Sequence, residues 1–118
     1  VVYSAIDSEA AATVSPTVIG TVIRERIGFD GLLISDDLSM EALQGSLGSR
    51  AAAAFGAGCD IVLHCNGAMD EMRQVAAECA PLSPETGRRV LDARTRLQRI
   101  SAPKAMTRRL ARRLGEPS

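Results

Sequence analysis

Residues 28–40 read Gly-Phe-Asp-Gly-Leu-Leu-Ile-Ser-Asp-Asp-Leu-Ser-Met, an apolar run that stops at two neighbouring carboxylates. The uninterrupted apolar residues 32–34 are typical of a parallel strand that is covered on both faces. In α/β sheets and barrels such strands present functional groups at their carboxyl ends, which is where Asp36 and Asp37 lie. We therefore predict an α/β fold with a working carboxylate at the end of this strand.

The two carboxylates are expected to differ in role. Successive strand residues point to opposite faces, so one aspartate can face a site while the other binds backbone or caps the next segment. From composition alone, Asp36 is also explained as a capping residue at a strand-to-helix turn. For Asp37 the alternatives are that it orients its neighbour or binds substrate, or that it is a helix cap or loop anchor. Met40 is either a pocket-lining side chain or core filler.

The stretch resembles a motif of the bacterial β-N-acetylhexosaminidases of glycoside hydrolase family 3. Their motif reads Gly-Phe-Asp-Gly, two or three apolar residues, then Ser-Asp-Asp-Leu-Ser-Met. Residues 23–27 (Ile-Arg-Glu-Arg-Ile) and 57–60 (Ala-Gly-Cys-Asp) are also similar to the family, so the resemblance covers residues 1–66 well and the remainder loosely. By position it implies that Asp36 is the catalytic nucleophile, and it suggests Asp37 and Met40 as substrate-binding residues.

The resemblance also implies a fold. A complete TIM-type (β/α)8 barrel needs about 250 residues, and this chain has 118. We expect the C-terminal portion of such a barrel, with two to three β/α units followed by C-terminal helices. Residues 1–118 would then be one partial catalytic domain that includes the basic helices of residues 84–118, and upstream chain would supply the rest of the barrel.

The implied reaction is the release of terminal β-linked N-acetylglucosamine with retention, through a covalent glycosyl-enzyme on Asp36. The implied substrates are peptidoglycan-derived muropeptides in the bacterial cytoplasm, and no cofactor is implied. Cleavage also needs a proton donor. In the resembled enzymes this donor is a His assisted by an Asp, on a loop that precedes the present segment. His64 does not match that motif, so we expect residues 1–118 alone to be inactive.

Caps and apolar periodicity predict the other elements. Ser15 followed by Pro16 is typical of a helix start, and Gly28 is a suitable left-handed end for that helix. Further predictions are a helix over residues 49–57, a strand over residues 59–65 buried on both faces, a helix over residues 69–79, and a break at residues 81–84. A helix with an Asp92–Arg96 pair then follows, and a last basic helix starts at Pro103.

The charge distribution is uneven although the net charge is zero. Residues 1–87 hold 4 basic and 12 acidic side chains, whereas residues 88–118 hold 10 basic and 2 acidic ones. The arginine cluster of residues 88–113 could contact nucleic acid. Because no aromatic residues are interleaved with it, we expect a solvated helix face and no nucleic-acid partner. No stretch approaches the roughly 20 apolar residues of a membrane span, so we expect no membrane partner.

Metal binding is one role that the only histidine, His64, could have. Three cysteines leave an odd thiol in any disulfide scheme, which favours a reducing compartment. On the predicted strand Cys59 and Cys65 share one face and His64 points to the other, which opposes a joint zinc site. Two other classes remain as alternatives: a receiver-like signalling domain, whose first strand also ends in an acidic pair, and a non-catalytic basic interaction module.

Overall fold

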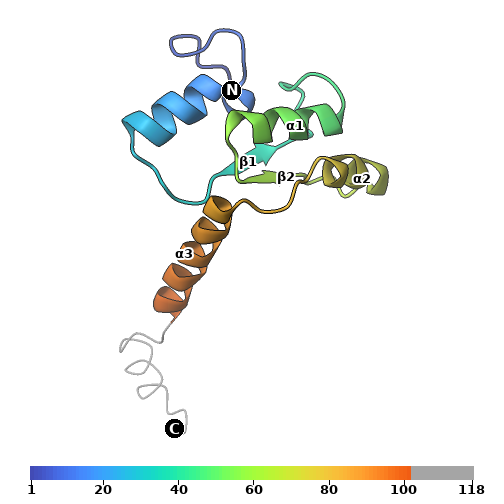
Figure 1. The fold of residues 1–118 in the computed structure, drawn as a ribbon. Helices are drawn as coiled ribbons and strands as arrows, with labels where there is room; N and C mark the ends of the chain where they lie inside the picture. The colour runs from blue at the N-terminus through green and yellow to red at the C-terminus, as the bar shows by residue number, and fades with distance from the viewer. Residues whose placement is uncertain (102–118) are drawn as a thin grey trace, which may run out of the picture.

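A computed structural model describes residues 1–101 of the chain (Figure 1). Strands and helices alternate after two N-terminal helical segments. The predicted helix from Pro103 lies outside the described residues. The elements are η1 (Ala12–Val14), η2 (Thr17–Arg26), β1 (Ile34–Asp37), α1 (Leu47–Ala57), β2 (Ile61–Leu63), α2 (Met69–Ala77) and α3 (Pro84–Ser101).

The two strands form a parallel pair joined through α1, which is a β-α-β unit. Ile34 lies opposite Ile61 and Asp37 lies opposite Leu63, with a bulge in β1 between these two pairs. The prediction of a mixed α/β fold with parallel strands is confirmed. That this unit belongs to an eight-stranded barrel stays a prediction.

β1 begins later than the apolar run suggested. The run of residues 32–34 was predicted to be the strand, whereas β1 extends from Ile34 to Asp37. The Leu33 carbonyl accepts the N–H of Asp60 at 2.9 Å and that of Ile61, the first residue of β2, at 3.2 Å, and the Leu38 N–H donates to the Leu63 carbonyl at 2.8 Å. Pairing with β2 therefore places both aspartates inside the strand, at its last two positions.

The prediction that both strand faces are buried was wrong for the described residues. Ile34 is 52% exposed and Leu63 is 43% exposed. The helical layer covers one face of the pair, where the side chains of Leu33 and Val62 pack against the core. Residues 1–101 cover Ile34 and Leu63 only in part, so these two apolar side chains stay open to solvent.

Local sequence explains where the helices begin and end. The buried Ser15 hydroxyl accepts the Val18 N–H at 3.0 Å, and Gly28 has a φ of 72°, as the predicted helix start and end require. Ser46 caps α1 in the same way through Ser49. The small residues of α1 allow close packing against α2 and η1. The buried core residues are Ala11, Ile19, Leu38, Leu43, Ala51, Ala54, Ala57, Cys59 and Val75.

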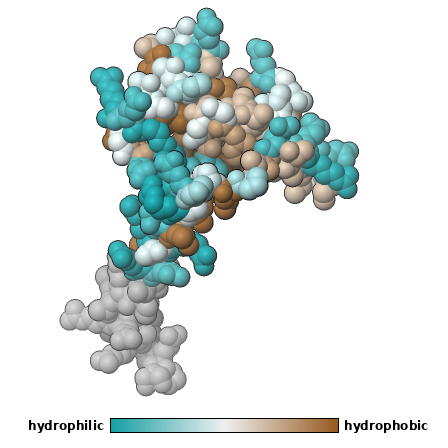
Figure 2. Space-filling model, in the orientation of Figure 1, coloured by the Kyte–Doolittle hydropathy of each residue, from teal (hydrophilic) through white to brown (hydrophobic). Residues whose placement is uncertain are grey.

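Helix α3 extends away from the body of the structure (Figure 1). Hydrophilic residues dominate its surface, with apolar ones among them (Figure 2), and Leu91 and Leu97 are both more than 60% exposed. The predicted Asp92–Arg96 pair was wrong, because Asp92 accepts from Arg88, one turn earlier, at 3.1 Å. No described helix is both long enough and apolar enough to cross a membrane.

Candidate functional site at the carboxyl end of β1

Asp36 lies exposed at the next-to-last position of β1. Its Oδ1 accepts the N–H of the following residue, Asp37, at 2.8 Å. Within residues 1–101 no group donates to its Oδ2. The residue also lines a small hollow of about 160 Å³, whose apolar wall includes Ile19 and Cys59. The arrangement leaves one carboxylate oxygen available at the end of a strand, as a nucleophile requires.

Asp37 engages a different part of the structure, as the alternation of strand side chains predicts. Its Oδ1 accepts the N–H of Ser39 at 3.0 Å and the N–H of Cys65 at 3.2 Å, and its Oδ2 accepts the Ser39 hydroxyl. These hydrogen bonds, led by the one from the Ser39 hydroxyl, lower the pKa of Asp37. The contacts are those of a loop anchor, which is one of the roles expected for this residue.

Ser35 was not singled out from the sequence, although it directly precedes the carboxylates. It is 7% exposed, and its hydroxyl accepts the Leu63 N–H at 3.0 Å and donates to the Asp36 carbonyl at 2.7 Å. The side chain thus bridges β1 and β2 within the bulge. A serine between an apolar run and an aspartate is the sequence feature that could have indicated this bridge.

Met40 is half-buried and packs against the hydrophobic core, in agreement with the core-filler alternative. The loop around it is held by Arg50, which donates to the carbonyls of Leu38 at 2.8 Å, Met40 at 3.2 Å and Gly45 at 3.0 Å. A substrate-binding role for Met40 stays a prediction.

His64 directly follows β2, and its side chain is only 6% exposed. Its Nε2 lies 3.2 Å from a carboxylate oxygen of Glu71 on α2, but neither ring nitrogen has a well-formed hydrogen bond. Among the described residues, no group of three or more His, Cys, Asp or Glu side chains converges on a point that could hold a metal ion.

A buried carboxylate, Asp60, lies just before β2 and holds the first half of the 28–40 motif through the Leu33 N–H. Its side chain is 3% exposed. It accepts hydrogen bonds from Arg24 at 2.8 Å and from the Leu33 N–H, Thr86 and Arg89 at 2.9 Å each. Burial alone would raise the pKa of Asp60, but the hydrogen bonds from the Leu33 N–H, Arg89 and Thr86 outweigh it and the pKa is lowered. Asp60 thereby connects η2, the residue before β1 and α3.

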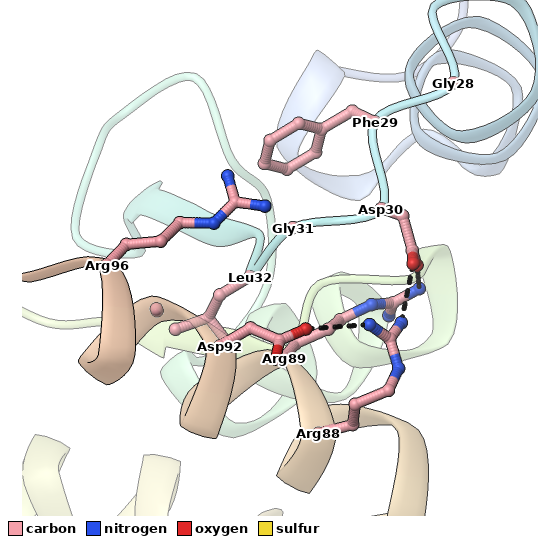
Figure 3. Close-up of a pocket in the computed structure, with 10 residues that line it drawn as sticks. Gly28, Phe29, Asp30, Gly31, Leu32, Arg88, Arg89, Asp92 and Arg96 are labelled. Carbon is pink, nitrogen blue, oxygen red and sulfur yellow. Dashed lines mark hydrogen bonds and ion pairs between the residues drawn. The ribbon is translucent and has the colours of Figure 1, made fainter.

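A pocket of about 530 Å³ borders this network (Figure 3). Asp30, from the Gly-Phe-Asp-Gly segment, accepts from Arg88 at 2.7 Å and from Arg89 at 3.3 Å. Figure 3 shows both guanidinium groups turned toward this carboxylate. The pocket lies at the amino end of β1, where residues 28–32 line it, whereas Asp36 lies near the carboxyl end of that strand. The start of the 28–40 motif therefore anchors α3 through Asp30, whereas its later part carries the Asp36 carboxylate.

The protein has a parallel β-α-β unit with the Asp36 carboxylate at the carboxyl end of β1. Enzymes built from β/α units present their catalytic groups at this end of their strands. The family can be stated more narrowly. The protein-family model described as "Glycosyl hydrolase family 3 N terminal domain" matches residues 1–100. The chain therefore belongs to this family. That membership confirms the resemblance inferred from the motif and sets aside the receiver-domain alternative.

Individual relatives agree with the family. A protein named Beta-hexosaminidase from Methylococcus capsulatus is 38% identical over 117 residues, which cover 98% of this chain and 29% of the relative. Proteins of the same name from Chromobacterium violaceum and Bordetella parapertussis are 40% and 46% identical over 92 and 68 residues, covering 76% and 56% of this chain and 26% and 19% of the relatives. The chain therefore spans less than a third of the length of these relatives.

Proposed function

We propose that Asp36 is the nucleophile of a retaining β-N-acetylhexosaminidase that releases terminal β-linked N-acetylglucosamine. The observation that carries this proposal is Asp36 Oδ2 at the carboxyl end of β1, which accepts no hydrogen bond from residues 1–101, in a chain whose relatives are named Beta-hexosaminidase. A carbohydrate is thus the proposed substrate class.

In the proposed reaction Asp36 Oδ2 attacks the anomeric carbon of the sugar. The bond from this carbon to the leaving oxygen breaks, and that oxygen takes a proton from a donor outside this chain. Water then attacks the same carbon and loses a proton to the same group, which restores the Asp36 carboxylate. Two inversions at one carbon give overall retention.

The setting of this site is part of the proposal. Residues 1–118 form part of a (β/α)8 barrel, and the exposed apolar side chains of Ile34 and Leu63 are where further barrel elements would pack. Residues 84–118 belong to the same domain, which is supported for α3 by its ion pairs to Asp30 and Asp60. Peptidoglycan-derived muropeptides are the proposed substrates, the bacterial cytoplasm is the proposed compartment, and no cofactor is involved.

The test uses a full-length protein that carries this chain. A fluorinated N-acetylglucosaminide that traps the glycosyl-enzyme, followed by peptide mapping, should label Asp36. Asp36→Ala should abolish trapping, whereas Asp70→Ala, which alters an exposed aspartate of α2, should not. A label on another residue would refute the assignment.

Purified residues 1–118 should show no turnover of an aryl β-N-acetylglucosaminide, and clear turnover would show that the chain holds its own proton donor.

A further inference from the structure

We propose that Asp37 is a positioning residue for the nucleophile: its carboxylate fixes the peptide whose N–H binds Asp36 Oδ1, and this leaves Asp36 Oδ2 directed at the substrate. The inference rests on the proposed function of Asp36. It assigns Asp37 a role through its neighbour rather than a contact with the sugar.

A bulge in β1 lies next to the nucleophile. Regular pairing between β1 and β2 is interrupted between Ile34 and Asp37, which is the interval that contains Asp36. Bulges re-aim side chains and remove ladder hydrogen bonds, so the local backbone needs other support. Ser35 provides it on one side, because its hydroxyl joins the Leu63 N–H to the Asp36 carbonyl.

Asp37 provides the support on the other side. Its Oδ1 receives the Cys65 N–H, which joins the end of β1 to the residues after β2, and it also receives the Ser39 N–H, which closes the turn that follows. With its side chain tied at both places, the Asp37 peptide is held in one orientation. The N–H of that peptide lies 2.8 Å from Asp36 Oδ1.

The hydrogen bond to Asp36 Oδ1 limits rotation of the Asp36 carboxylate. A nucleophile must approach its carbon in a narrow range of geometry, and displacement by about 1 Å can reduce the rate about 100-fold. Three donors already occupy the Asp37 carboxylate, out of about four acceptor positions that a carboxylate has. Most acceptor positions of Asp37 are therefore occupied by donors of this chain, as a positioning role requires.

Two substitutions separate positioning from direct use of the charge. Asp37→Asn keeps a carbonyl oxygen at the Oδ1 position, where both N–H groups are bound, and the Ser39 hydroxyl can turn to accept from the new amide. Asp37→Glu keeps the charge but is one methylene longer, so it displaces these contacts. Asp92→Asn and Asp92→Glu on α3 are the matched controls for each change.

The variants are made in the full-length protein and assayed with an aryl β-N-acetylglucosaminide. We expect Asp37→Asn to keep kcat within about fivefold of the unchanged protein, because only one hydrogen bond is weakened. Asp37→Glu should lower kcat and the rate of glycosyl-enzyme trapping by about 100-fold. KM should change little in either variant, because neither alters a group proposed to bind the sugar.

Several results would overturn the proposal. A loss in Asp37→Asn as large as in Asp37→Glu, at unchanged melting temperature, would mean that the charge itself is used. Full activity of Asp37→Glu would mean that the anchoring contacts do not position Asp36, and a rise in KM alone would indicate substrate binding. If Asp37→Glu fails to fold, Asp37→Ala, which removes all three anchoring contacts, takes its place and should lower kcat to a similar extent. Activity that persists in Asp36→Asn would instead refute the proposed nucleophile, whatever the Asp37 variants do.

Discussion

Replacing Asp60 by Ala is expected to destabilise the protein strongly. The Asp60 carboxylate is 3% exposed and accepts from two guanidinium groups, one hydroxyl and one backbone N–H. Removing one partner of a buried ion pair costs about 3–5 kcal/mol, and an unpaired buried N–H costs about 1–3 kcal/mol. These terms overlap, because both arise from desolvated donors that lose one acceptor.

The expected magnitude lies near the lower end of that range. Arg24 also donates to two backbone carbonyls, and Arg89 keeps Asp30 and Glu85 as partners. Both arginines also retain some exposure, 17% and 11% of their side chains. We therefore expect Asp60→Ala to lower the free energy of unfolding by about 3 kcal/mol.

The matched control is Asp70→Ala. Asp70 is 91% exposed, and its pair with Arg73 is 3.5 Å long, so the expected loss is below about 0.5 kcal/mol. Urea unfolding followed by far-UV circular dichroism measures both variants. A loss in Asp60→Ala within about 1 kcal/mol of the control would refute the reasoning, since the network would then add little beyond an exposed pair.

Three further predictions follow from packing, backbone geometry and protonation. Leu38→Ala should lower the free energy of unfolding by about 2–5 kcal/mol because Leu38 is fully buried, whereas Leu97→Ala on the exposed face of α3 should cost far less; equal losses by urea unfolding would contradict this. Gly58→Ala should destabilise by about 1–2 kcal/mol, because Gly58 has a φ of 112° and a Cβ there would lie 3.0 Å from an Ile19 methyl; an unchanged melting temperature would refute it. Stability should fall as the pH drops below the ordinary aspartate pKa of 3.8, because folding lowers the pKa values of Asp37 and Asp60. Their stabilisation is present above pH 3.8 and is lost as the pH falls through the folded-state pKa values. Asp60→Asn should weaken this acid dependence in a pH series of melting temperatures.

Local features of the chain were read correctly from the sequence. The Ser15 cap, the left-handed Gly28, the alanine-rich α1 and the break before Pro84 depend on interactions within a few residues. Asp36 and Asp37 lie at the end of β1, as the apolar run before them predicted. The role of Asp36 is still a proposal.

Other features depend on contacts between distant residues, and local patterns could not predict them. The start of β1 was misplaced because it is defined by hydrogen bonds to β2, more than 20 residues away. The Asp92 pair was misassigned because spacing on a helix allows Arg88 and Arg96 equally, and Arg88 is the one that lies beside Asp30. Exposure of Ile34 likewise follows from what packs against the sheet, not from its own hydrophobicity.

The two aspartates show the same division. Residue type and strand periodicity were enough to place Asp36 and Asp37 at the end of a strand with different surroundings. The bond to Asp36 Oδ1 is local, because its donor is the next residue, whereas the contact of Asp37 with the Cys65 N–H forms only when β1 and β2 lie side by side. A hydrogen bond needs a donor at about 3 Å, and Cys65, separated from Asp37 by 28 positions in the chain, reaches that distance only in the folded structure.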